Sequence, residues 1–129
     1  MTNTLNSGNN SDCTKEKNGF PCFVPAQRIL HQISSKWGIQ IIYILMKNKK
    51  LRYNDLRENL QKGWKKDKIS DATLSTRLSD FTKEGLIKRE VFPELPPKVE
   101  YSLTKKGEKL ASALQPLINW TIKACHGEE

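Results

Sequence analysis

One helix in this chain has both of its ends marked by the sequence. Ser70 is a favourable N-cap residue, and Asp71 in the first turn suits the positive end of the helix dipole. At the other end Gly85 can adopt the left-handed conformation that ends many helices, which lets Leu86 pack back on the last turn. These signals predict a helix over 71–84. Its apolar residues fall on one side: Leu74, Leu78 and Phe81.

A two-stranded hairpin is predicted directly after this helix, in "REVFPELPPKVEYSL" (residues 89–103). Apolar and polar residues alternate on both sides of a loop that contains three prolines, and a period of two is typical of strands. Because proline has no backbone N–H, these residues should end the strand pairing and hold the loop extended. The basic residues Arg89 and Lys98 flank this stiffened loop.

Three helices are predicted before this unit. The first begins near Pro25, since proline favours the first turn of a helix. The segment "WGIQIIYILM" (residues 37–46) is apolar almost all round, which indicates a helix buried in the centre of the domain. After the basic break "KNKK", the segment "LRYNDLRENL" (residues 51–60) is apolar on one side only. The next segment, "QKGWKKDK" (residues 61–68), is interpreted as a loop.

One more helix is predicted after the hairpin, capped by Thr104. Pro116 should kink this helix or restart it near Gln115, because its nitrogen cannot donate to the preceding turn. The N-terminal segment, residues 1–19, has hardly an apolar side chain and is predicted to be a disordered tail. Residues 20–125 would then form one domain, followed by a short tail, 126–129.

The net charge of the 129-residue chain is +8, which favours a polyanionic partner, nucleic acid before membrane. No apolar run approaches the roughly 18 residues of a transmembrane helix, and the N-terminus lacks the pattern of a signal peptide. We therefore expect a cytoplasmic protein with no membrane contact.

The order of elements predicts a mainly α fold with a small β-hairpin, the winged helix-turn-helix, whose second helix enters the major groove of DNA. With its apolar residues inward, the helix over 71–84 turns short polar side chains outward. We predict DNA contacts from Ser70, Ala72, Thr73, Ser75, Thr76 and Arg77 on this helix, from Arg89 and Lys98 on the hairpin, and from Lys65, Lys66 and Lys68 before the helix. A polar face of this kind can also be a merely solvated surface, and that alternative stays open.

Little in the sequence suggests catalysis. There are two histidines, and no nucleotide-binding loop, zinc-protease or serine-hydrolase motif. The acidic residues are dispersed among lysines rather than paired for acid-base chemistry. Cys13, Cys22 and Cys125 are too scattered for a disulfide scaffold or a C-x-x-C metal pair. We expect no enzymatic activity, no cofactor and no metal.

Several segments resemble the HxlR-type winged-helix transcriptional regulators, which are related in plan to the MarR group. They are "SSKWGIQIIYIL", "LRYNDLREN", "ISDATLSTRLSDFTKEGLIKREVFPELPPKVEYSLTKKG" and "LQPLINW". The resemblance covers residues 22 to about 121. It implies a homodimer, built from the N- and C-terminal helices, that binds pseudo-palindromic operator DNA and often represses transcription. The interface residues it implies here are Ile29, Leu114, Leu117 and Trp120.

The chain departs from the family pattern in two places. The turn between Leu60 and Ile69 is longer and richer in lysine, so that it either bulges away from DNA or adds phosphate contacts. The family commonly has a cysteine before its first helix, which in some members senses oxidants or electrophiles. Cys22 occupies this place, although Phe-Val follows it instead of Pro-Val, and the resemblance makes Cys125 a candidate partner across the dimer. Inert thiols are the alternative.

Two other functions stay open at this point. Winged helices also bind proteins through the same faces, so the chain could be a protein-interaction module. It could also be an architectural protein that coats DNA without sequence preference.

Overall fold

The computed structural model describes residues 21–63 and 68–125 of the chain. The predicted tails, 1–19 and 126–129, lie outside the described residues, as do Trp64 and the two lysines that follow it.

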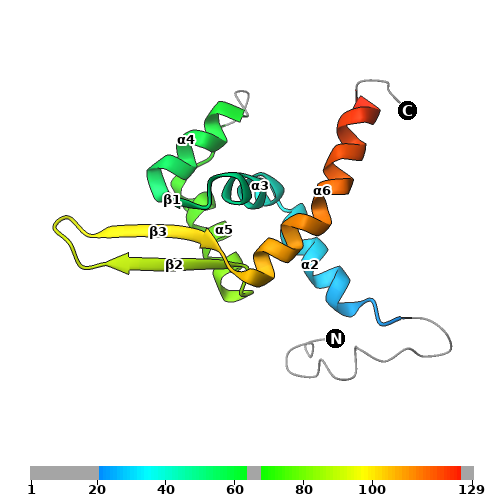
Figure 1. Cartoon of the computed structure of the whole chain (residues 1–129), viewed down its shortest axis with the longest axis horizontal. Coiled ribbons are helices and arrows are strands. Elements are labelled where there is room, and N and C mark those ends of the chain that lie inside the picture. Colours follow the sequence, from blue (N-terminus) through cyan, green and yellow to red (C-terminus); the bar gives the residue numbers. More distant parts are fainter. Residues whose placement is uncertain (1–20, 64–67, 126–129) are drawn as a thin grey trace.

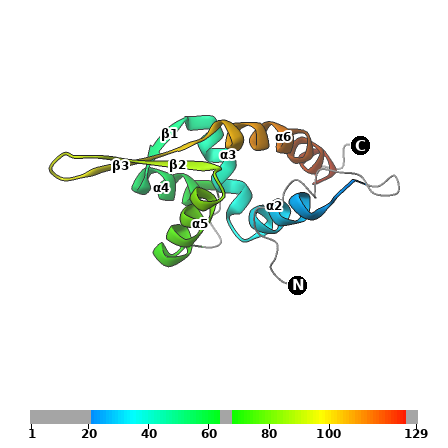
Figure 2. The same cartoon turned by 90° about the horizontal axis from the view of Figure 1, so that it is seen from below.

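The chain forms α2 (Val24–Ser34), α3 (Gly38–Asn48), β1 (Lys50–Arg52), α4 (Tyr53–Gly63), α5 (Asp71–Lys83), β2 (Ile87–Phe92), β3 (Lys98–Leu103) and α6 (Lys105–Cys125). In both Figure 1 and Figure 2 the β2–β3 hairpin projects to one side of the body, and α2 with the second half of α6 projects to the other. The mainly helical winged-helix plan is confirmed.

The sheet is larger than the predicted hairpin, because β1 adds a third antiparallel strand to it. The strand order is β1-β3-β2, with Lys50 opposite Ser102 and Arg89 opposite Tyr101. From the sequence, the residues around Lys50 are expected to form only a break between two helices. A strand of three residues has no period of its own, and the pairing with β3 defines it.

Helix α4 also differs at both ends from the prediction over 51–60. It begins at Tyr53, since Leu51 and Arg52 belong to β1, and it continues to Gly63, into the segment interpreted as a loop. The Gln61 side chain lies in this added turn, and its Oε1 accepts a hydrogen bond from the backbone N of Ile69 at 2.8 Å. This hydrogen bond joins the last turn of α4 to the residue that precedes the N-cap of α5.

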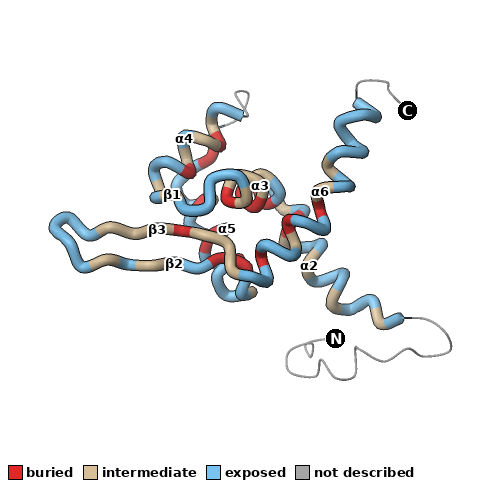
Figure 3. Tube along the Cα trace, viewed as in Figure 1, coloured by how far each residue is buried: buried red, intermediate tan, exposed pale blue. Residues whose placement is uncertain are grey.

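Helix α3 crosses the centre of the core. Ile41, Ile42 and Leu45 are at most 1% exposed, and burying a side chain of this size contributes about 1.5–3 kcal/mol. Around them pack apolar residues of every other helix and of the sheet, which are red or tan in Figure 3. Burial of the segment is not complete on all sides as predicted, since Ile39 is exposed.

The start of α6 is fixed by Thr104 and Gly107. The Thr104 Oγ1 accepts a hydrogen bond from Gly107 N at 3.0 Å, which confirms the predicted cap. Gly107 lies against the carbonyl of Leu86, where a Cβ atom would overlap that oxygen. Further along, α6 continues through Pro116 as one helix and does not restart, and Figure 1 shows it bending midway.

Candidate nucleic-acid interface

The angle between α4 and α5 is held by a polar cluster at the first turn of α5. The Tyr53 hydroxyl donates to Asp71 Oδ1 at 3.0 Å, and Arg57 Nη1 lies 3.0 Å from the same oxygen. Asp71 therefore contacts two successive turns of α4, one by a hydrogen bond and the other by an ion pair. Its carboxylate also lies at the positive end of the α5 dipole, which adds to the stability of the arrangement.

The Tyr53 hydroxyl is protonated in this cluster. Burial raises the pKa of Tyr53 above its ordinary value, and the Asp71 carboxylate acts in the same direction. A hydrogen bond with Ser75 and the charge of Arg57 oppose this rise. The neutral phenol is the form that can donate to Asp71.

Both ends of α5 are formed by the residues that the sequence indicated. The Ser70 Oγ accepts from Thr73 N at 3.1 Å, and Ser70 has the extended backbone of an N-cap. Gly85 has a positive φ of 82°, and Leu86 N donates to the Phe81 carbonyl at 2.9 Å. This is the predicted Schellman arrangement.

Apart from Arg77, the residues predicted to contact DNA at α5 and its N-cap divide into two groups. Ala72, Ser75 and Thr76 are exposed along the outer face of the helix. Ser70 and Thr73 are joined by their hydroxyls, 3.0 Å apart, in addition to the cap. In the free protein these two residues therefore cap the N-terminus of α5.

Arg77 points away from this outer face. It is half-buried, and its Nε donates to the backbone carbonyl of Lys36 at 2.9 Å. This contact connects α5 to the turn between α2 and α3, and no sequence pattern indicates it.

Arg89 lies on the side of the wing, the β2–β3 hairpin, that faces α5. Because side chains alternate along a strand, it shares that side with Tyr101. Between the wing and α5 runs a groove lined by Ser75, Leu78, Ser79, Thr82, Lys83, Arg89 and Tyr101. Lys83 was not among the predicted residues, although its spacing of four and eight from Ser79 and Ser75 on a helix could have indicated it.

Lys98 lies on the opposite side of the wing from Arg89. Its Nζ is 3.3 Å from Glu100 Oε2 and 5.2 Å from the centre of the Phe92 ring. Lys88 is on that side too, 3.5 Å from Glu90. The register thus places Lys88 and Lys98 on the side of the wing opposite the groove that Arg89 lines, and the predicted DNA contact of Lys98 stays a prediction.

The turn before α5 is only partly described. Lys68 is exposed directly before the buried Ile69. Lys65 and Lys66 lie outside the described residues, so their predicted phosphate contacts stay predictions.

The residues implied for the dimer interface also divide. Leu117 and Trp120 are exposed, and Ile29 is half-buried. Leu114 belongs to the core of its own protomer, where it is only 7% exposed, so it offers little surface to a partner. Leu114 thus packs within its own protomer, and its place in the interface stays a prediction.

The two cysteines that the structure describes are both free thiols. Cys22 is half-buried and lies directly before α2, and Cys125 is exposed at the end of α6. Among the described residues, no helix is long and apolar enough to span a membrane, and no group of His, Cys, Asp and Glu could hold a metal ion.

The chain resembles known transcriptional regulators in sequence and in structure. The family model described as HxlR-like helix-turn-helix matches residues 32–129. An HTH-type transcriptional regulator of Halalkalibacterium halodurans is 37% identical over 94 residues, which cover 73% of this chain and 78% of that protein.

Two solved structures have the same fold. A MarR-family transcriptional regulator of Enterococcus faecalis has a TM-score of 0.70 and 30% identity, over 88% of this chain and 96% of that one. The reduced form of the transcriptional regulator YodB from Bacillus subtilis has a TM-score of 0.67 and 26% identity, over 82% of this chain and 97% of that one. The chain belongs to the HxlR-like helix-turn-helix family and is a DNA-binding transcriptional regulator.

Proposed function

We propose that the protein acts as a homodimer on a pseudo-palindromic operator, with one α5 in the major groove of each half-site. The two recognition helices would then lie about 34 Å apart, one turn of B-DNA. The observation that carries this proposal is the spatial separation of two surfaces: a groove between α5 and the wing that includes Lys83 and Arg89, and a set of exposed apolar side chains on α2 and α6. The wing projects to one side of the body, and α2 and the second half of α6 project to the other (Figures 1 and 2).

The contacts to bases are assigned to the outer face of α5. Ala72 is small enough to let the helix approach the bases, and the hydroxyls of Ser75 and Thr76 can donate to or accept from base edges. Ser70 and Thr73, at the N-terminus of the helix, are placed to meet phosphate, because backbone N–H groups and the helix dipole favour anions there.

The contacts to the phosphate backbone are assigned to cations around the same face. Arg89 and Lys83 flank the groove between α5 and the wing. Lys65, Lys66 and Lys68 precede α5 in the sequence. Phosphate contacts carry most of the affinity and little of the specificity.

The dimer interface is assigned to the exposed apolar side chains of α2 and α6. Around α2 these are Phe23, Val24 and Leu30, beside the half-buried Ile29. On α6 they are Leu117, Trp120 and Ile122. Exposed large apolar residues on two helices that project from the body are typical of an interface that a second copy covers.

We further propose repression as the mode of action, since a dimer bound across an operator excludes other proteins from it. We assign DNA binding rather than catalysis to the chain. We propose the cytoplasm as its location, since operator DNA lies there. Cys22 is assigned as a thiol that responds to oxidants, with Cys125 of the second copy as its candidate partner. Cys22 is half-buried and lies directly before α2, which carries part of the proposed interface, so oxidation of its thiol would act directly on that interface.

Selection of bound sequences from random DNA tests the main proposal, with and without oxidant. We expect an inverted repeat whose half-site centres are about 10 base pairs apart. Recovery of unrelated sequences would favour an architectural DNA-binding protein. Failure to bind DNA, together with a protein that binds the same faces, would favour an interaction module. Sedimentation of the free protein determines separately whether it is a dimer.

A further inference from the structure

Two arginine side chains connect the recognition helix α5 to α2, which carries part of the proposed dimer interface, and to the turn that follows α2. Arg77, in the middle of α5, donates from Nε to the Lys36 carbonyl at 2.9 Å. Arg28, on α2, places its Nε 3.2 Å from Oε2 of Glu84, the residue that ends α5. The contacts therefore hold α5 at two points along its length.

Apolar packing does little to fix α2 relative to α5. Ile33 is the buried residue of α2, near its C-terminal end. A groove separates the two helices, lined by His31, Gln32, Ser35, Arg77, Asp80 and Phe81. The angle between α2 and α5 is thus set largely by the side chains that bridge this groove.

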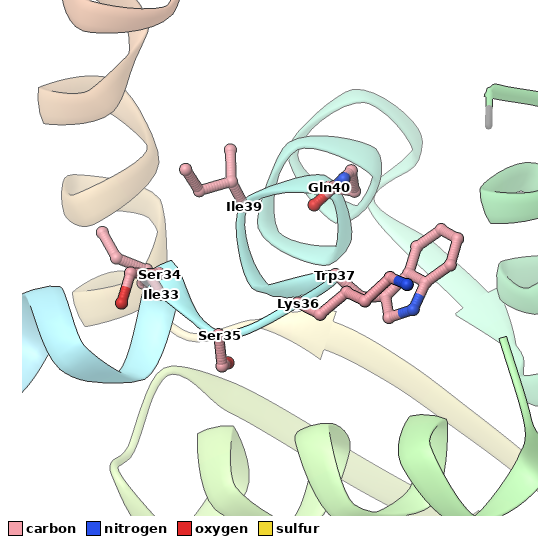
Figure 4. Close-up of a pocket in the computed structure, with 7 residues that line it drawn as sticks. All are labelled: Ile33, Ser34, Ser35, Lys36, Trp37, Ile39 and Gln40. Atoms are coloured by element: carbon pink, nitrogen blue, oxygen red, sulfur yellow. The ribbon is translucent and has the colours of Figure 1, made fainter. Parts of the chain in front are cut away.

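The acceptor of the Arg77 bond belongs to a tightly held turn. Trp37 has a positive φ of 76° and is 3% exposed, and Gly38 N donates to the Ser35 carbonyl at 2.9 Å. Figure 4 shows Lys36 and Trp37 extending to one side of the turn and Ile39 to the other. The Lys36 carbonyl is therefore a fixed point, and Arg77 fastens the middle of α5 to it.

We propose that Arg77 is a positioning residue rather than a base-contacting one, and that it acts with the Arg28–Glu84 pair to set the half-site spacing that the dimer accepts. The inference rests on the proposed dimer. If α2 contributes to the interface, the direction of α5 relative to α2 determines where the second α5 meets the DNA. One inserted base pair moves a half-site by about 3.4 Å and rotates it by about 35°, which a rigid pair of helices cannot follow.

The test compares operators with the selected spacing and with one base pair added or removed. We expect the wild type to bind the operator with the selected spacing about tenfold or more tightly than the operators with one base pair added or removed. Adding or removing a base pair should cost about the free energy of one well-made base contact. Arg77→Met and Arg28→Met should lower this preference below about threefold. Arg77→Lys keeps a donor and should restore part of it. Arg52→Met removes an arginine of β1, outside α5 and outside both bridges, and should leave the preference unchanged.

Two outcomes would overturn the inference. The first is an unchanged spacing preference in both methionine variants; the second is a loss in Arg77→Met that is confined to substitutions at one base pair, as for a base-contacting residue. Sedimentation and thermal melting identify any variant that fails to fold or to dimerise. If Arg77→Met is such a variant, the spacing preference of Arg77→Lys is the measurement that tests the inference. A monomeric wild type would instead contradict the proposed dimer itself, so the two failures can be told apart.

Discussion

The phenol of Tyr53 donates a hydrogen bond to Oδ1 of Asp71 across 3.0 Å, and so joins the first helix of the helix-turn-helix to the first turn of the recognition helix. Arg57 reaches the same carboxylate from the next turn of α4. The sequence marks Tyr53 only as a residue of an apolar stripe. The structure shows that its hydroxyl joins α4 to the first turn of α5.

Tyr53→Phe should lower the free energy of unfolding by about 1 kcal/mol at pH 7, because it removes this hydrogen bond and keeps the ring. Urea unfolding measures the change. Tyr43→Phe on α3 is the matched control, since it removes a hydroxyl remote from Asp71 and should change the stability less. Equal effects of the two substitutions would contradict the role assigned to the Tyr53 hydroxyl.

The Tyr53–Asp71 hydrogen bond should also make the free energy of unfolding depend on pH in the alkaline range. The pKa of Tyr53 is raised in the folded state, so the folded chain holds this proton more tightly than the unfolded chain. The contribution of the neutral phenol is therefore fully present below about pH 10 and is lost as the pH rises through the folded pKa. The difference in stability between wild type and Tyr53→Phe should shrink from pH 9 to pH 11, as measured by urea unfolding at each pH.

Arg89→Ala should weaken binding to all DNA sequences more than Lys98→Ala does. Arg89 is exposed beside the groove under α5, whereas the charge of Lys98 is already neutralised by Glu100. About ten phosphate contacts per dimer predict a slope near −9 for log K against log salt, and losing one arginine per protomer should reduce its magnitude by about 2. Titrations at several salt concentrations measure both variants. A larger loss for Lys98→Ala would show that DNA contacts the other side of the wing.

Trp120→Glu should convert the protein to a monomer, because it places a charge in the centre of the proposed interface. Trp120 is 65% exposed in the single chain. Val91→Glu is the matched control, since Val91 is 53% exposed but lies on the wing, away from α2 and α6. Sedimentation equilibrium should give a monomer for the first variant and a dimer for the second, and a dimer in both cases would place the interface elsewhere.

Treatment with diamide should lower operator affinity and produce a covalent dimer on non-reducing gels. Cys22→Ser should abolish both effects, and Cys125→Ser should abolish the covalent dimer if Cys125 is the partner. Cys13→Ser is the control thiol and should behave like the wild type. Identical responses of wild type and Cys22→Ser would exclude Cys22 as the responsive thiol.

Gly107→Ala should destabilise the fold by about 1–3 kcal/mol, because its methyl group would overlap the Leu86 carbonyl at the start of α6. Gly63→Ala, at the end of α4, meets nothing within 4 Å and should be neutral or stabilise by up to about 1 kcal/mol. Thermal or urea unfolding of the two variants provides the comparison. A mild effect at Gly107 would mean that α6 can shift along the sheet.

The local signals of the sequence predicted individual elements well. Ser70 and Gly85 define the ends of α5, and Thr104 defines the start of α6, because a cap depends on residues only a few positions apart. The strand β1 was missed for the opposite reason, since its partner residues lie about fifty positions away on β3.

What the sequence by itself determined is the order of the helices and the hairpin, and the buried and outward faces of α5. Only the tertiary structure decided that Arg77 bonds to the Lys36 carbonyl, that Arg89 and Lys98 lie on opposite sides of the wing, and that Leu114 belongs to the core. Helical and strand periodicity tell which residues share a face, but not what that face meets. A long, charged side chain finds its partner among groups that the fold brings near, and those groups are distant in the chain.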